Sequence, residues 1–358
     1  MFKKKFILLI LFCLLFQQCN TTEPPVKVEK NPRTYEWTID TLSYPSSLQT
    51  RMQSIWGSSP KNMYVTGHCD DIRGQLWHYD GKQWTSIYNA FGVAYTPSVV
   101  YGFSTNDIWV AGGSWAGTST ADSAFIIHYD GSSWNRINAY GGKSITTIWG
   151  KSPEDIWFGG LNGTLFHWDG VTIKRDTLPI DIPLNAEPFD QLSIYGRATA
   201  DETYFMFTDL SSFIQTHTYL FVRKQNNWSV IDSSLWGYFR KKVWVSEKGN
   251  IYETGSEGFF KWNGSSWDNI LGWFNGSTSG IEALSESENN MFIVGWDFPE
   301  VGEKRGLVYH YNGDDFYLYE NLRLDDVSFL DVWWNGEEVF IVGLTGKFPQ
   351  KSIILHGK

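Results

Sequence analysis

The chain has few cysteines and few charged residues, and each shortage excludes certain structural features or partners. It holds three cysteines among 358 residues, and two of them, Cys13 and Cys19, lie in the first nineteen positions. Cys69 therefore has no internal partner for a disulfide, and we expect a small buried apolar residue there. Charged residues make up 19% of the chain, and the formal net charge is −10. A nucleic-acid partner would require a basic face, so the sequence predicts none.

The sequence also lacks the short motifs that are typical of common catalytic and ligand-binding sites. It contains no nucleophile elbow, Walker loop, dinucleotide fingerprint or calcium-loop pattern. Acidic residues are numerous, so neighbouring carboxylates are expected by chance. We therefore predict no catalytic residue, no metal site and no cofactor from sequence alone.

Long apolar runs are missing except at the N-terminus. Lys3, Lys4 and Lys5 precede an apolar stretch over residues 6–16, and Cys19 follows. Eleven apolar residues are too few for a standard transmembrane helix and are typical of an export signal. The segment 1–19 resembles a bacterial lipoprotein signal, in which Cys19 would be lipidated and become the mature N-terminus.

The residues before Cys19 depart from the small residues that such signals use, because Phe16-Gln17-Gln18 stand there. Ordinary cleavage and an uncleaved anchor therefore remain alternatives to lipidation. Residues 20–33 are rich in Pro, Thr, Lys and Glu and are interpreted as a flexible tether. The sequence thus predicts an exported protein, lipid-anchored in the cell envelope, that meets the membrane only through this anchor.

Aromatic residues, in contrast, are plentiful and recur at fixed spacing. Trp, Tyr and Phe make up 17% of the chain, a composition that favours strands. Two sequence pieces alternate. The first is an Ile-Trp-Gly element, found at Ile55-Trp56-Gly57, Ile148-Trp149-Gly150 and, in weaker form, Ile194-Tyr195-Gly196 and Val332-Trp333-Trp334. The second is a His-Tyr-Asp-Gly-x-x-Trp element, found at residues 78–84 and 128–134 and in variants at 167–170, 261–267 and 310–313.

The spacing of equivalent points averages about 46 residues, the size of a four-stranded propeller blade. We name the strands of such a unit A to D. Strand A carries Ile-Trp-Gly, strand C carries the histidine, and strand D begins at the tryptophan. Asp-Gly or Asn-Gly between C and D is a strong hairpin signal, because both residues accept positive φ.

The two ends of the chain complete each other. Residues 353–357 look like a strand C without a strand D, and residues 35–40 look like a strand D without a preceding blade. Pairing the two would close the ring and remove the free edge. The sequence therefore predicts an all-β fold: one seven-bladed β-propeller over residues 34–358, with the last blade closed by the N-terminal strand.

Five of the seven histidines occupy the same position of successive strands C, namely His78, His128, His167, His310 and His356. A recurring position indicates a recurring structural role, because equivalent residues of different blades lie far apart. We expect packing or a turn hydrogen bond at these positions, not metal ligation.

The two repeated elements resemble those of exported bacterial β-propeller proteins, most of them uncharacterised. Some of those proteins carry a glycosyltransferase-like or other carbohydrate-related label without an evident active-site motif. The resemblance covers nearly the whole mature chain. It implies the fold and says little about activity, since repeats specify architecture while function lies in the loops.

Candidate site residues come from the connections that vary in length. The B–C and D–A connections lie on one face of a propeller and hold most of the variation. We interpret residues 113–118 and 296–300 as B–C insertions, and 91–95, 179–189 and 271–276 as D–A insertions. Binding residues concentrate on such loops. The candidate ligand-binding residues are the aromatic ones, Trp115, Trp273, Phe274, Trp296 and Phe298.

Three functions fit this interpretation, and the third, a purely structural role in envelope assembly, predicts no small-molecule binding at all. The first is a non-enzymatic scaffold on the bacterial cell envelope that binds a glycan or a protein through the B–C/D–A face, since aromatic rings beside polar groups suit both. The second is a carbohydrate-active enzyme (a glycosyl transferase, hydrolase or lyase) that uses acids such as Asp70, Asp297 or Glu300 at the channel mouth.

Overall fold

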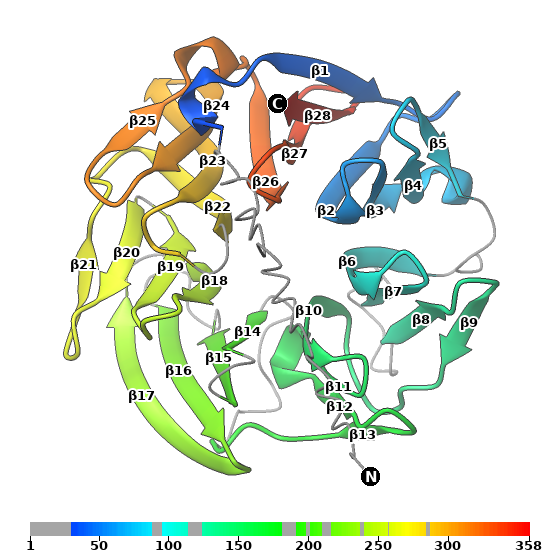
Figure 1. Ribbon diagram of the computed structural model, residues 1–358, viewed down its shortest axis with the longest axis vertical. Helices are drawn as coiled ribbons and strands as arrows, with labels where there is room; N and C mark the ends of the chain where they lie inside the picture. Colours follow the sequence, from blue (N-terminus) through cyan, green and yellow to red (C-terminus); the bar gives the residue numbers. More distant parts are fainter. Residues whose placement is uncertain are drawn as a thin grey trace, which may run out of the picture.

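Seven four-stranded antiparallel sheets stand around a central axis in the computed structural model of the chain (Figure 1). The structure describes residues 30–87, 95–113, 124–180, 191–197, 201–209, 216–236, 240–256, 258–283 and 287–358. Strand A of each blade lies nearest the axis and strand D lies at the circumference. Within these residues, no helix has the length and apolar character needed to cross a membrane. The predicted seven-bladed β-propeller is confirmed.

The blades follow one another along the chain, four strands at a time. Blades 1 to 3 consist of β2 (Thr50–Ser59), β3 (Asn62–Cys69), β4 (Leu76–Tyr79), β5 (Trp84–Ser86), β6 (Thr96–Ser104), β7 (Asp107–Gly113), β8 (Phe125–Tyr129), β9 (Trp134–Ile137), β10 (Ile145–Ser152), β11 (Asp155–Gly160), β12 (Leu165–Trp168) and β13 (Ile173–Arg175). Blades 4 and 5 consist of β14 (Gln191–Arg197), β15 (Glu202–Asp209), β16 (Thr216–Lys224), β17 (Asn227–Trp236), β18 (Arg240–Val245), β19 (Ile251–Gly255), β20 (Gly258–Trp262) and β21 (Trp267–Asn269).

Blades 6 and 7 consist of β22 (Gly276–Ala283), β23 (Met291–Glu300), β24 (Glu303–Tyr311), β25 (Phe316–Leu318), β26 (Val327–Trp334), β27 (Val339–Thr345), β28 (Ser352–Gly357) and β1 (Trp37–Leu42). Short 3₁₀ turns occur at η1 (Pro32–Thr34), η2 (Ile72–Gly74), η3 (Leu161–Gly163) and η6 (Glu320–Leu322).

The first strand of the chain closes the ring. β1 pairs antiparallel with β28, from Trp37 opposite Gly357 to Leu42 opposite Ser352. Beyond the strands, the Glu36 N–H donates to the Lys358 carbonyl at 2.9 Å, and the Lys358 N–H donates back to Glu36 at 3.1 Å. The last blade therefore contains both ends of the folded chain, as predicted. The strand begins two residues later than the sequence segment 35–40.

Apolar side chains fill the spaces between neighbouring blades. In one such cluster, Trp109 and Ile126 of blade 2 pack against Ile148 and Phe158 of blade 3. Strand alternation places one set of side chains toward the preceding blade and the other toward the following blade. Each blade thus buries both faces only in the presence of its neighbours, which couples the ring into one unit.

The repeated histidines hold strand C against strand B. The Nε2 atoms of His128 and His167 lie 2.7 Å from the carboxylates of Asp107 and Asp155, at the start of strand B. Their rings stack at 4.1 Å on Trp109 and Trp157. The three other repeated histidines, in blades 1, 6 and 7, make the equivalent contacts His78–Asn62 at 2.8 Å, His310–Asn290 at 2.6 Å and His356–Glu338 at 2.6 Å. The predicted structural role is confirmed.

The Asp-Gly pairs between strands C and D are tight turns, as predicted. Gly81, Gly131 and Gly170 have φ of 90°, 91° and 88°. The Asp80 carboxylate accepts the backbone N–H groups of Gln83 and Lys82, both at 2.9 Å. These hydrogen bonds hold the pKa of Asp80 below its ordinary value. The conspicuous acids of the repeat are therefore turn residues.

One predicted loop is a strand. The sequence interpretation placed residues 296–300 in a B–C insertion, whereas they form the last part of β23. β23, with ten residues, is the longest strand B that the structure describes, and it forms a hairpin with β24 in which Asp297 lies opposite Arg305 and Glu300 opposite Glu303. Gly302, at φ 88°, permits the tight turn at its tip.

Candidate interaction surface

We call the face formed by the B–C and D–A connections the loop face, and the opposite face, with the A–B and C–D connections, the turn face. Ten large hydrophobic side chains are exposed among the described residues. Six of them lie on the loop face: Leu48, Tyr140, Trp273, Phe298, Val301 and Phe348. Val171 is on the turn face, and Ile39, Val230 and Tyr317 lie on outer strands. Exposed apolar surface is therefore concentrated on one face.

Four of the five aromatic residues predicted for the site lie in two neighbouring segments at blade 6, and we call them the aromatic patch: Trp273, Phe274, Trp296 and Phe298. The first two lie in the D–A connection after β21, and the other two lie on β23. The Phe298 N–H donates to the Asn275 carbonyl at 2.6 Å and joins the two segments. Trp273 is 61% exposed and Phe298 37% exposed, while Phe274 and Trp296 are half-buried. The fifth, Trp115, lies outside the described residues.

An ion pair supports the patch from behind. Both carboxylate oxygens of Asp297 accept from Nη2 of Arg323, at 2.6 and 2.7 Å. Arg323 directly follows η6 in the D–A connection of blade 6. The two side chains are only 14% and 17% exposed. A short, little-exposed pair of this kind fixes the β23–β24 hairpin relative to the next connection.

The acids named for the enzymatic alternative do not come together. Asp70 follows β3 in blade 1, and its carboxylate accepts from the Leu48 N–H at 2.9 Å, the Gln49 N–H at 3.3 Å and the Ser47 hydroxyl. Burial would raise the pKa of Asp70, but these hydrogen bonds lower it below its ordinary value. Asp297 is paired and Glu300 is exposed, both in blade 6. Among the described residues, no three His, Cys, Asp or Glu side chains form a group that could hold a metal.

Backbone hydrogen bonds join the loop face from blade 6 to blade 1. The Asp326 N–H donates to the Lys304 carbonyl at 2.7 Å, and the Gly346 N–H donates to Asp326 at 2.8 Å. Farther along, the Gln350 N–H donates to the Leu48 carbonyl at 2.8 Å. This bonded rim displays Val301, Phe348 and Leu48. Sequence reasoning missed all three, although Phe348, an apolar residue between Lys347 and Pro349 in a short connection, was a usable signal.

One strand A position is equivalent in all seven blades around the axis, and in five of them a polar side chain there ties blades together: Ser54, Thr147, Ser193, Lys242 and Asp331. Val99 and Gly280 occupy the other two. The Ser54 hydroxyl accepts the Val100 N–H of the next blade at 3.2 Å, and the Asp331 carboxylate accepts the Ile55 N–H at 3.1 Å. Nζ of Lys242 lies 2.5 Å from Asp331, so the pair bridges blades 5 and 7. The polar groups around the axis thus position the blades.

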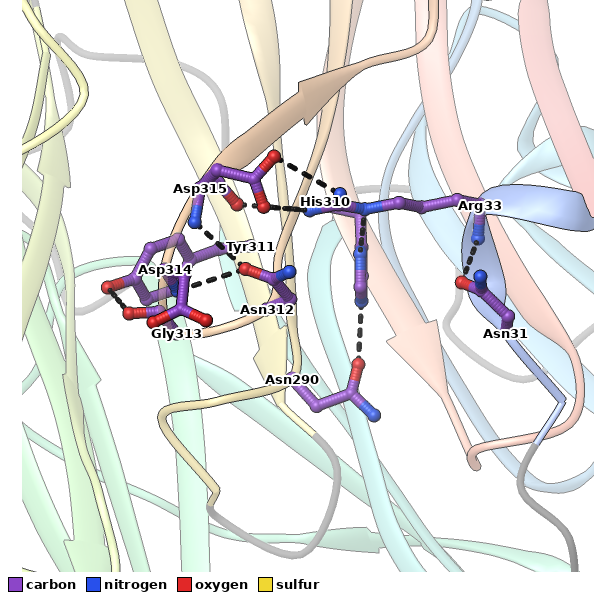
Figure 2. Close-up of polar contacts among 9 residues, drawn as sticks. All are labelled: Asn31, Arg33, Asn290, His310, Tyr311, Asn312, Gly313, Asp314 and Asp315. Atoms are coloured by element: carbon purple, nitrogen blue, oxygen red, sulfur yellow. Dashed lines mark hydrogen bonds and ion pairs between the residues drawn. The ribbon is translucent and has the colours of Figure 1, made fainter.

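The chain enters the propeller on the turn face, at a clasp around Arg33 (Figure 2). Arg33 donates from Nη2 to Asp315 Oδ1 at 2.8 Å and from Nε to His310 Nδ1 at 3.3 Å, and Asn290 holds His310 Nε2. Burial, followed by the charge of Arg33, lowers the pKa of His310 to about 4. The neutral imidazole then accepts from Arg33 and donates to Asn290. Residues 31–33, assigned to the tether from sequence, thus contact blade 6.

Comparison with known proteins shows the fold and no family. No family model matches the chain, and no curated protein matches it. Among solved structures, "YCF48 bound to D1 peptide" matches with a TM-score of 0.58 and 13% identity over 92% of this chain and 97% of that chain. The propeller domain of Cps50 (Swd1) from Myceliophteria thermophila matches with a TM-score of 0.58 and 8% identity, covering 88% and 99%.

The WD40 propeller domain of Doa1 is a third similar structure, with a TM-score of 0.53 and 10% identity over 89% of this chain and 96% of that one. Sequence identities this low show a shared architecture alone. The chain is therefore similar to other propellers over nearly its full folded length.

Proposed function

We propose that this protein is a non-enzymatic scaffold of the bacterial cell envelope that binds a partner protein through its loop face. The observation that carries the proposal is the concentration of exposed hydrophobic side chains there, six of the ten in the described residues. On the turn face, in contrast, the repeated side chains form the tight turns and hold neighbouring strands together. Exposed apolar patches bordered by polar groups are typical of protein-binding surfaces.

A protein partner explains the chemistry of the loop face better than a glycan does. Leu48 and Val301 are aliphatic and exposed, and with Phe348 they extend the surface well beyond the aromatic patch. Sugars are held by aromatic faces with nearby polar groups, whereas a spread of aliphatic and aromatic anchors suits a protein. The similar structure of YCF48 with a D1 peptide supports this preference, since that propeller is itself a peptide-binding protein.

The N-terminus supports the choice of face. If Cys19 carries lipid, the membrane attachment reaches the propeller at Asn31 and Arg33, on the turn face. Eleven residues lie between Cys19 and Asn31, and this stretch spans at most about 40 Å. An anchor on the turn face leaves the loop face free to meet a partner in the envelope.

Affinity purification from envelope extracts tests the proposal with a matched pair of variants. Val301 and Val171 are both exposed valines, one on the loop face and one on the turn face. We expect Val301→Glu to abolish recovery of the protein that the unmodified chain enriches, because a carboxylate in an apolar contact must be desolvated. Val171→Glu adds the same charge and should leave recovery unchanged. Loss with Val171→Glu alone would place the interface on the turn face.

A glycan is the second candidate ligand, favoured by one observation. Trp273 presents most of its ring to solvent, with the Asn275 amide two residues away. Glycan-array binding that disappears in Trp273→Ala and persists in Val301→Glu would favour this second candidate over a protein partner.

A further inference from the structure

The outer strand of blade 4 differs from the outer strand of every other blade. β17 extends over ten residues, whereas the other outer strands have three to six. Figure 1 shows it as a long curved strand at the circumference. In the part of the chain that the structure describes, β17 pairs with β16 alone. A long free edge offers backbone donors and acceptors to another strand, and proteins normally keep such edges short.

Side chains on both faces hold the edge in place. The Trp228 ring lies 4.8 Å from the ring of Phe205 and belongs to the cluster between blades 3 and 4. Ile231 packs on the other side, in the cluster shared with blade 5. The indole N–H of Trp267 donates to Asp232 at 2.9 Å. The edge is therefore preorganised, and a partner strand would find it already extended.

The hairpin geometry determines which peptide groups face outward. Gln225 and Asn226 have φ of 48° and 66° and form a two-residue turn, so the flanking residues, Lys224 and Asn227, exchange hydrogen bonds. Peptide groups alternate in direction along an antiparallel strand. Those of Asn227 and Ser229 point to β16, and those of Trp228 and Val230 point away from the propeller. An irregularity in the pairing at Ile231 ends this regular run.

The outward run is also uncharged. Ser229 is exposed, and the Val230 side chain is 57% exposed. Among the other outer strands, β1 carries Asp40, β9 carries Arg136, β13 carries Lys174 and Arg175, and β21 carries Asp268. Pairing any of these with its own copy would bring like charges together, which destabilises a sheet. The net charge of −10 makes such repulsion costly over most of the surface.

We propose that the β17 edge pairs antiparallel with the β17 edge of a second copy of this chain, about a two-fold axis at Ser229. In this register Trp228 lies opposite Val230 of the partner subunit, and the reverse pair forms by symmetry. Each pair exchanges two backbone hydrogen bonds. Ser229 faces Ser229 of the partner subunit in a non-hydrogen-bonded pair, and no charged side chain faces its own copy. The contact is isologous, so it closes at two subunits.

Cysteine cross-linking tests both the contact and its register. Cα atoms of a non-hydrogen-bonded pair lie about 4.5 Å apart, within the range of a disulfide. We expect the full-length Ser229→Cys chain, mildly oxidised in detergent, to give a species of twice the chain's mass that reductant removes. The unmodified chain reports any background from Cys13 and Cys19. The matched control is Ser233→Cys on the same strand, which the register separates from its copy by about 26 Å.

A second variant tests whether the backbone edge holds the contact. The Val230 N–H is not used within the blade, so Val230→Pro removes only an outward donor. In the Ser229→Cys background it should abolish the cross-linked species while leaving the melting temperature within a few degrees. Val230→Lys, which protects an edge without changing the backbone, should give the same loss. Cross-linking of Ser229→Cys no greater than that of the unmodified chain, or equal in Ser233→Cys, would overturn the proposal.

Discussion

The turn face and the loop face are built from the same seven blades, yet they use their side chains differently. On the turn face, His128 holds Asp107, and Asp80 closes its own turn, so each conspicuous polar residue has a structural partner. On the loop face, Val301, Phe348 and Trp273 project into solvent. In this fold, therefore, a repeated residue is engaged in a structural contact, and surface available for binding lies where the repeat is interrupted.

Replacing a buried aromatic residue of the repeat should have the largest effect on stability. Trp157 is 1% exposed and stacks on His167. We expect Trp157→Ala to lower the free energy of unfolding by about 3–5 kcal/mol, from lost burial and the cavity left behind. Thermal unfolding followed by tryptophan fluorescence or calorimetry measures the change. Trp157→Phe should retain most of the stability, and a Trp157→Ala chain that melts like the unmodified one would contradict the packing described.

Breaking the ion pair behind the aromatic patch should have the second-largest effect on stability. Arg323→Ala leaves the little-exposed Asp297 carboxylate without the Nη2 group that donates to both of its oxygens, at an expected cost of about 2–3 kcal/mol. The control is Arg305→Ala, which removes a partly exposed pair with Glu303 and Asp325 and should cost at most about 0.5 kcal/mol. Equal melting temperatures for the two variants would show that the hairpin does not depend on Asp297.

The clasp on the turn face should make stability depend on pH. The pKa of His310 is lowered to about 4 in the folded chain, so the unfolded chain binds the proton more readily. The stabilisation is fully present above the unfolded pKa, about 6.5, and is lost as pH falls through about 4. We expect the unmodified chain to lose about 2 kcal/mol more than His310→Gln between pH 7 and pH 4.

Glutamine preserves the acceptor for Arg33 and the donor to Asn290 without titrating, so this variant isolates protonation from packing. Denaturation curves at pH 7, 5.5 and 4 measure the difference. Parallel losses in the two chains would assign the acid sensitivity to other groups.

The smallest effect on stability is expected on the loop face. Trp273 is mostly exposed and meets Phe260 edge-on at 5.9 Å. Trp273→Ala should change the free energy of unfolding by no more than about 0.5 kcal/mol. The same measurement as for Trp157→Ala gives the contrast directly. A loss comparable to that of Trp157→Ala would show that the aromatic patch is core, and the distinction between the two faces would fail.

The sequence was sufficient to predict the architecture because the same strand pattern recurs in several units of the repeat. The Ile-Trp-Gly and His-Tyr-Asp-Gly elements locate strands A and C, and the incomplete units at Trp37 and Ile354 pair as expected. The two segments that carry the candidate aromatic residues at blade 6 also lie side by side, joined by the Phe298–Asn275 backbone hydrogen bond. They do so through a strand extension, however, because residues 296–300 continue the β23–β24 hairpin. The sequence around those residues does not distinguish a long hairpin from a loop.

Contacts between distant blades were beyond sequence reasoning for a different reason. Lys242 and Asp331 are 89 positions apart and meet past the intervening blade 6. Gly280 stands at the equivalent position of the intervening blade and offers no side chain there. Each residue is ordinary in its own segment, and only the closed ring brings them together. The length of β17 was similarly hidden, because blade 4 lacks the Asp-Gly or Asn-Gly turn that marks the end of strand C in blades 1, 2, 3, 5 and 6.

Site-specific photo-crosslinking in the native envelope tests the central claim most directly. A photoreactive amino acid placed at Val301 and, in a second chain, at Val171 samples the two faces at highly exposed valines. We expect a discrete protein adduct from Val301 and none from Val171. Adducts of the same partner from Val171, with none from Val301, would contradict the assignment of the loop face as the binding surface.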